Sequence, residues 1–305
     1  MRIHNNVISY MVKLSIGFLI VLFTPFQIPA IIYLQSVIGA YTANIGLVFG
    51  YFGAMSIFFT AYIFSNEIFS LLYMALIALP PIFMGHLIKK GKSPYSAIII
   101  PTFLYGFCEV LTYYYFASQR GKTVAGYILG IFNDTLKKFE AYALNPSVLN
   151  YNNAITFIIS KLLVGFILIF SLCFIVTTYY IVAKKTYLLQ GGKIKYLPFT
   201  KFKLDKSFTV FYIILLGATY FLSDSYIGTI LLNMSVFVSF IFVIEGLSVI
   251  MHYFRFLSKT LHKAIAVLLI ALSIVFVSIM TKSAAAVLLV LGIGVLDSFI
   301  CLKRW

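Results

Sequence analysis

Five ionisable residues interrupt long apolar stretches of this sequence. They are Lys13, Glu109, Lys161, Glu245 and Asp297. A stretch of about 20 apolar residues is long enough to cross a bilayer as a helix. A charged side chain near the middle of such a helix costs about 2.5–3.5 kcal/mol on insertion scales. Each of the five residues is therefore a candidate for ion pairing or for binding a ligand.

Glu109 and Lys161 are expected at the same depth in consecutive helices. Glu109 lies eight residues before the end of the apolar segment Tyr95–Ala117, and Lys161 lies about eight residues inside Ala154–Val182. At 1.5 Å per residue, both would lie about 12 Å below the outer surface. The two residues can form an ion pair that sets helix register, form the polar end of a ligand cavity, or never meet.

Glu245 is the deepest of the acids. It lies near the middle of the apolar segment Ile227–Phe254, beside Gly246, and no basic residue of the neighbouring segments matches its depth. We expect either a neutral, hydrogen-bonded packing role or the binding of a cation or a ligand amine. Asp297 lies four residues from the end of the last segment, so we expect it to reach interfacial water or Lys303.

The composition places the whole chain in a membrane. Of its 305 residues 62% are hydrophobic and 10% are charged, and the mean hydropathy is +1.03. A soluble domain carries roughly 25% charged residues. The formal net charge of +15 comes from bases at the ends of apolar segments. This distribution follows the positive-inside rule and argues against nucleic-acid binding.

The apolar segments predict an all-α, polytopic transmembrane helical bundle with 8–10 spans and both termini cytoplasmic. An uncleaved first span is expected, because no small-residue cleavage pattern follows it. The candidate spans are Val7–Thr24, Ile28–Ala43, Ile45–Phe64, Ile68–Ile88, Tyr95–Ala117, Ala154–Val182, Phe208–Leu222, Ile227–Phe254, Ala264–Met280 and Ala284–Cys301.

A basic stretch, Lys184–Lys206, divides these segments into two groups. It holds seven lysines and a single acid, Asp205, which is typical of a cytoplasmic connector. We therefore predict an N-terminal membrane half (1–183), a connector (184–206) and a C-terminal membrane half (207–305). Ser118–Asn153 is expected outside, with Asp134–Leu144 as either a short interfacial helix or part of a solvated loop.

Three glycines at four- and three-residue intervals, Gly46, Gly50 and Gly53, lie in or beside the segment Ile45–Phe64. Small residues at such spacing allow another helix to approach closely. They predict a helix-packing face, and they favour association with other membrane proteins only weakly.

Several short motifs resemble a family of bacterial membrane proteins. They are Tyr196-Leu197-Pro198-Phe199, Lys203-Leu204-Asp205, Glu245-Gly246-Leu247-Ser248, the run Leu291–Asp297, and the basic segment Gly85–Lys92 at the end of an apolar span. Together they resemble the uncharacterised YybS-like proteins, which implies the bacterial cytoplasmic (inner) membrane. The layout is also similar to the substrate-binding subunits of energy-coupling-factor transporters. That similarity implies a small molecule bound within a helical bundle that docks on an ATPase module.

Three functions compete at this point. The first is a small-molecule or lipid-binding transport component, with Glu109, Lys161 and Glu245 as ligand-binding residues. The second is a cell-envelope scaffold that binds other membrane proteins, and the third is an enzyme acting on a lipid-linked substrate. The sequence has no HExxH, Gly-x-Ser-x-Gly or P-loop motif. We therefore expect no enzyme, no cofactor and no metal, with the lipid bilayer as the main partner.

Overall fold

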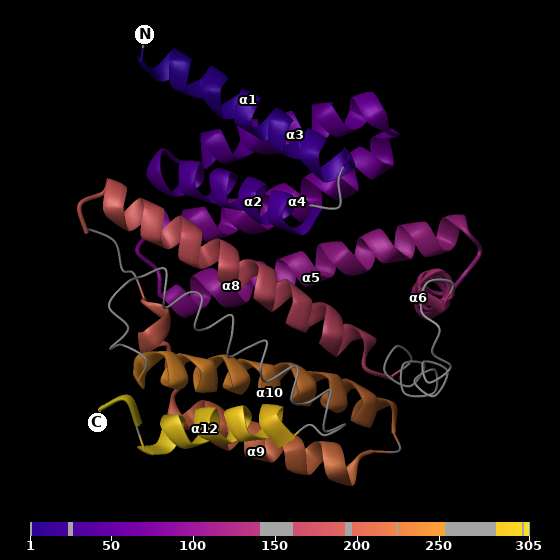
Figure 1. Ribbon diagram of the computed structural model, residues 1–305, viewed down its shortest axis with the longest axis vertical. Helices are drawn as coiled ribbons and strands as arrows, with labels where there is room; N and C mark the ends of the chain where they lie inside the picture. Colours follow the sequence, from indigo (N-terminus) through magenta and orange to yellow (C-terminus); the bar gives the residue numbers. More distant parts are fainter. Residues whose placement is uncertain are drawn as a thin grey trace. The chain divides into compact units, whose positions relative to one another are not determined.

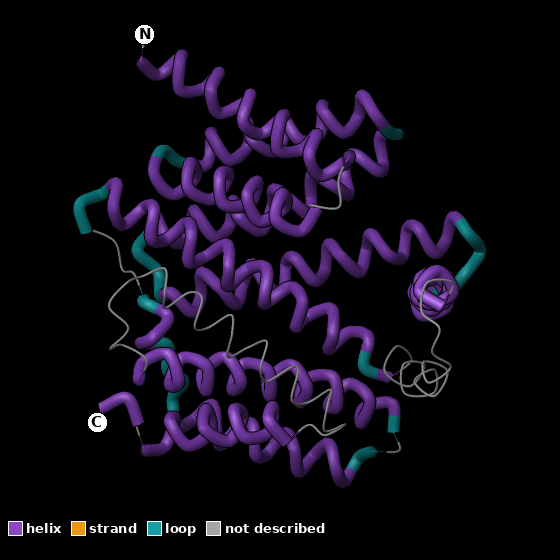
Figure 2. The backbone as a smooth tube through the Cα atoms, viewed as in Figure 1, coloured by secondary structure: helices purple, strands orange, loops and turns teal. Residues whose placement is uncertain are grey.

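The computed structural model describes residues 2–23, 27–140, 161–192, 197–223, 225–253, 285–300 and 302–304, and every regular element within these ranges is a helix (Figures 1 and 2). The predicted all-α class is thereby confirmed. The expected span Ala264–Met280 and the basic turn before it lie outside the described residues, so the number of spans stays a prediction.

The described helices fall into two compact units. Unit 1 comprises Met1–Ser160 and Ile167–Tyr196, and unit 2 comprises Lys161–Phe166 and Leu197–Trp305. The division between Tyr196 and Leu197 falls inside the basic stretch that the sequence predicts as a connector. Each unit has its own packing and is described separately.

Unit 1 is built around α2. This helix packs against α1, α3 and α4, and its Leu34 and Ile38 are fully buried together with Ile57 of α3 and Ile77 of α4. The helices of the unit are α1 (Arg2–Phe23), α2 (Gln27–Asn44), α3 (Leu47–Phe64), α4 (Glu67–Lys89), α5 (Pro94–Gln119), α6 (Val124–Glu140) and most of α8 (Leu163–Leu189).

The turns of unit 1 have local causes in the sequence. Asn66 begins α4 by accepting a hydrogen bond from the Phe69 N–H at 2.8 Å, and Ser93 accepts one from the Ser96 N–H before α5. These side chains satisfy amide groups that have no partner within the first helical turn. Gly91 adopts a φ of 64° in the turn between the two helices, a conformation that glycine allows at little cost.

Helices α6 and α8 extend beyond the segments that the sequence predicts for them. Helix α6 begins at Val124, ten residues before the expected Asp134–Leu144 segment. Helix α8 continues to Leu189, so Lys184 and Lys185 of the basic stretch are helical. Lysines are good helix formers, and an apolar helix can therefore extend through a pair of them without a break.

Unit 2 is built around α10 (Tyr226–Tyr253), which packs against both α9 (Lys206–Phe221) and α12 (Ala285–Ile300) (Figure 1). The unit also contains two short 3₁₀ helices, η2 (Phe199–Lys201) and η4 (Leu302–Arg304), and the start of α8. Phe242 of α10 is fully buried and contacts the rings of Phe208 and Tyr212 from α9.

The helix surfaces suit a bilayer. Five of the described helices, α3, α4, α5, α8 and α10, are long and apolar enough to cross one. Large apolar side chains are exposed on them, and in lipid such exposure carries no cost because the acyl chains are equally apolar. Shorter apolar helical stretches occur at Tyr10–Val21, Lys206–Phe221 and Val287–Ile300.

Candidate functional site

A buried group of charged side chains lies in unit 2, and we call it the carboxyl cluster: Glu245 of α10, Asp297 of α12 and Lys303 of η4. The side chains of Glu245 and Asp297 are fully buried. The Lys303 ammonium lies 3.2 Å from Asp297 Oδ2, and the Lys303 backbone N–H donates to Asp297 Oδ1 at 3.2 Å. The carboxyl groups of Glu245 and Asp297 also interact with each other.

Two glycines bring the acids of the cluster together. A Cβ atom on Gly246 would overlap the carbonyl oxygen of Val290, and one on Gly294 would overlap that of Phe242. The backbones of α10 and α12 are therefore in direct contact, as small residues permit in membrane helices. Glu245 is next to Gly246, and Asp297 lies three residues after Gly294, so this backbone contact brings the two acids within electrostatic range of each other.

The segment before α9 folds back onto the cluster. Glu245 Oε1 accepts a hydrogen bond from the Leu204 N–H at 3.0 Å, and Ser248 donates to the carbonyl of Phe199 at 2.5 Å. The Lys303 ammonium donates to the Phe202 carbonyl. Since the side chains of Phe202 and Leu204 are buried, this part of the expected connector is packed and is not a solvated loop. We call residues 199–204 the latch segment.

The electrostatics of the cluster are unbalanced. It holds two carboxyl groups and one ammonium group. Burial lowers the pKa of Lys303 below its ordinary value, and the neighbouring Asp297 opposes this shift. No group of three or more His, Cys, Asp and Glu side chains able to hold a metal occurs within the described ranges. The chemistry open to the cluster is ion pairing and the binding of a single small cation or proton.

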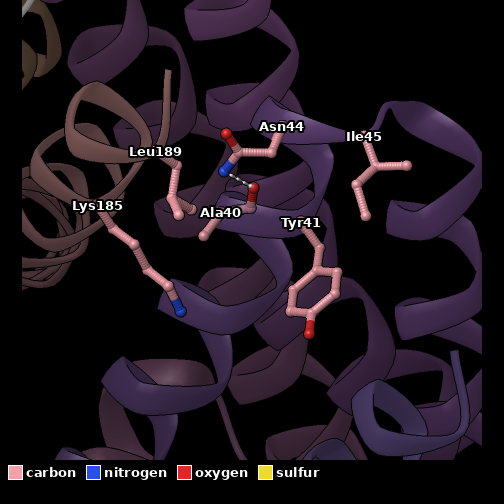
Figure 3. A pocket seen from close by; sticks show the side chains of 6 residues that line it. All are labelled: Ala40, Tyr41, Asn44, Ile45, Lys185 and Leu189. Carbon is pink, nitrogen blue, oxygen red and sulfur yellow. Dashed lines mark hydrogen bonds between the residues drawn. The ribbon is translucent and has the colours of Figure 1, made fainter. Parts of the chain in front are cut away.

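Unit 1 contains a pocket of about 220 Å³ between α2 and α8. Figure 3 shows Lys185 and Leu189 on the α8 side of the pocket and Ala40, Tyr41 and Asn44 on the α2 side, with Ile45 just beyond α2. Among the described residues, the lining has one charged side chain, Lys185, and no acid. The pocket therefore combines a cationic group with an apolar wall.

Asn44 at the end of α2 makes hydrogen bonds within its own helix, to α8 and to the residue that follows α8. Asn44 Nδ2 donates to the Ala40 carbonyl at 2.8 Å and to Thr186 Oγ1 at 3.4 Å, and Gln190 donates to Asn44 Oδ1 at 3.3 Å. A second lysine, Lys89 at the end of α4, donates to the Ile45 carbonyl at 2.6 Å. These contacts hold the rim of the pocket in place and put a second cation near it.

Comparison with protein families matches residues 9–298 to a family described as "Predicted membrane protein (DUF2232)". The chain belongs to the DUF2232 family. No curated protein and no solved structure matches it. A DUF2232 protein is thus embedded in a membrane, and the family description itself names no activity.

The residues that the sequence singles out in this DUF2232 protein occupy different places. Glu109 lies half-buried on α5 in unit 1, where Tyr113 donates to its Oε1 at 3.2 Å. Lys161 belongs to unit 2, so the predicted Glu109–Lys161 pair stays a prediction. Lys13 is exposed on α1. Of the alternatives for Asp297, the structure shows the ion pair with Lys303.

The backbone of Lys161, which precedes α8, contacts α10 at a different level from Glu245. Asn233 donates to the Lys161 carbonyl at 2.7 Å and accepts from the Gly165 N–H at 2.7 Å, which ties the start of α8 to α10. Asn233 precedes Glu245 by 12 residues, or about 18 Å along a helix. The Lys161 backbone is therefore far from the carboxyl cluster.

The three glycines of the predicted packing face also differ in role. A Cβ on Gly50 would lie 2.7 Å from Thr42 Oγ1, and one on Gly53 would overlap the Tyr10 hydroxyl. Both glycines thus contact helices of unit 1 itself. Gly46 precedes α3 with a φ of 137°, so it lies in a turn and not on the helix face.

Sequence reasoning missed several residues of this DUF2232 protein. It found no basic residue near Glu245, because Lys303, whose charge acts on Glu245, follows α12 and does not belong to a neighbouring span. It also passed over Ser248 and Lys185. Ser248 stands in the Glu-Gly-Leu-Ser motif, and that motif was the available signal for a contact with the latch segment. For Lys185, the sequence offered only its charge, and the charge alone does not indicate a pocket.

Proposed function

We propose that this membrane protein is a binding component of transport, and that the unit 1 pocket binds the anionic headgroup of a lipid. The observation that carries this proposal is the lining of the pocket. In the part of the chain that the structure describes, Lys185 is its charged group, no acid lines it, and Tyr41, Ile45 and Leu189 form an apolar wall. Basic pockets between membrane helices bind anionic headgroups in this way.

The size of the pocket supports a headgroup over a larger ligand. Pockets for drug-sized molecules measure roughly 300–1,000 Å³, whereas this one measures about 220 Å³. A phosphate with a short glycerol unit is a better match than a drug-sized molecule. The apolar wall then suits the first carbons of an acyl chain, so an anionic amphiphile uses both parts of the lining.

The more specific predictions from the sequence are also part of this proposal. They are the YybS-like identity, the bacterial inner membrane, a role without catalysis, and the energy-coupling-factor layout with its docking partner. The alternative of a scaffold draws less support, because Gly50 and Gly53 contact residues of their own unit. A glycine face that already packs against helices of its own unit is not available to bind another protein.

The test compares two adjacent lysines. We expect phosphatidylglycerol, but not phosphatidylcholine, to raise the Tm of the detergent-solubilised protein, because a ligand that binds the folded state stabilises it. Lys185→Gln should weaken this response about fivefold in lipid concentration, since a lysine near an anionic headgroup contributes about 1 kcal/mol. Lys184→Gln removes the same charge beside the pocket lining and should respond as the wild type does.

The controls separate the possible sources of the anion. If glycerol 3-phosphate alone reproduces the shift, the ligand is a small molecule and not a lipid. An equal loss in both lysine variants would mean that general surface charge, and not the pocket, attracts the lipid. Absence of any shift with either ligand would reject the proposed function.

A further inference from the structure

Two buried carboxylate oxygens of the carboxyl cluster differ in their partners: Asp297 Oδ2 faces the Lys303 ammonium, and Glu245 Oε2 has no partner among the described residues. Among the described residues, neither Glu245 Oε2 nor Asp297 Oδ2 takes part in a hydrogen bond, although both are buried. Asp297 Oδ2 has the Lys303 ammonium 3.2 Å away. The carboxyl groups that carry these oxygens interact with each other. Buried polar atoms in native proteins nearly always have a partner, so Glu245 Oε2 indicates a missing one.

The charges of the surroundings limit what the missing partner can be. Glu245 and Asp297 would carry two negative charges if both were ionised, and within the cluster Lys303 supplies one positive charge. The other charged group described beside the cluster is Lys203, which acts on Lys303. From α9 the nearby side chain is the uncharged Thr209, bonded to Ser298 at 2.5 Å. A buried charge without a partner is costly, so one further positive charge is needed.

We propose that Glu245 and Asp297 form a proton-binding site that shares one proton between Glu245 Oε2 and Asp297 Oδ2. A proton suits this place better than a metal ion, because a metal needs more oxygen ligands than two carboxyl groups offer and would be repelled by Lys303. The proton turns one of the two oxygens into a donor and the other into its acceptor. It also leaves a single negative charge opposite Lys303.

The site controls the latch segment. Glu245 holds the Leu204 N–H, and Lys303, which Asp297 orients, holds the Phe202 carbonyl. When the latch segment leaves, the carboxyl groups are hydrated and release the shared proton to water. Closing therefore takes up one proton, and by linkage raising the pH favours the open arrangement. This inference concerns unit 2 and is independent of the pocket in unit 1.

Hydrogen–deuterium exchange of the latch segment tests the inference on the full chain in detergent. After correction for the intrinsic exchange rate, we expect the protection of the Leu204 amide to fall with rising pH, by at most about tenfold per pH unit for one proton. Glu245→Gln keeps a side chain of the same shape that cannot release a proton. Its protection should be independent of pH.

Ser248→Ala is the matched control. It removes hydrogen bonds to Phe199 and Phe202 without touching the carboxyl groups, so protection should drop at every pH while its pH dependence is kept. If the wild type and Glu245→Gln share one pH dependence, the proton site does not exist.

Infrared spectroscopy provides a measurement on the wild type that does not depend on how a variant folds. We expect a protonated-carboxyl band at neutral pH that persists in Glu109→Gln and is absent from Glu245→Gln. A wild-type spectrum without such a band would show both acids ionised and would overturn the proposal.

Discussion

Gly294→Leu is expected to separate α10 from α12 and to destabilise unit 2 severely. The added Cβ would overlap the carbonyl oxygen of Phe242 and lie 3.0 Å from the Gly246 nitrogen. Overpacking of a tight contact costs about 1–3 kcal/mol and occasionally more. Here the obstacle is backbone, which cannot rotate away as a side chain can, so we expect a loss at or above the top of this range.

Gly292→Leu is the control, because it lies two residues earlier on the same helix. A Cβ at Gly292 meets no atom of the described residues within 4 Å, and replacing a helical glycine gains up to about 1 kcal/mol of helix propensity. Thermal unfolding in mild detergent compares the two variants. Equal Tm values for Gly294→Leu and the wild type would contradict the direct backbone contact between α10 and α12.

Lys303→Met is expected to have the second large effect. The ammonium of Lys303 is paired with Asp297 and is largely buried, with a side-chain exposure of 10%. Removing one partner of a buried ion pair typically costs about 3–5 kcal/mol, because the other charge is left unpaired. The methionine keeps the apolar bulk of the side chain, so lost packing contributes little.

A second substitution should repair part of this loss. In Lys303→Met with Asp297→Asn, the carboxylate that had lost its partner is gone, so the double variant should be more stable than the sum of the two single losses predicts. Unfolding free energies of the four proteins in the cycle measure the coupling. Strictly additive losses would show that Lys303 and Asp297 do not act as a pair in the folded protein.

The sequence by itself determined the class of the fold and the positions of many helices. Helix α4 runs from Glu67 to Lys89, where hydropathy predicts Ile68–Ile88, and α5 runs from Pro94 to Gln119, where it predicts Tyr95–Ala117. Apolar length and the capping residues at helix ends are local properties, and the bilayer demands them of every span. The contact between Asp297 and Lys303 could also be predicted from the sequence, because the two residues are only six positions apart.

Only the tertiary structure shows which side chains of different helices lie next to each other. Glu245 meets Leu204, which is 41 residues away, and it lies beside Asp297 because Gly246 and Gly294 let two backbones touch. The pocket beside Lys185 depends likewise on α2 meeting α8. Hydropathy assigns depth along a helix, but it does not say which face meets which neighbour. That choice depends on the small residues and polar groups of distant segments, and they act only once the helices pack.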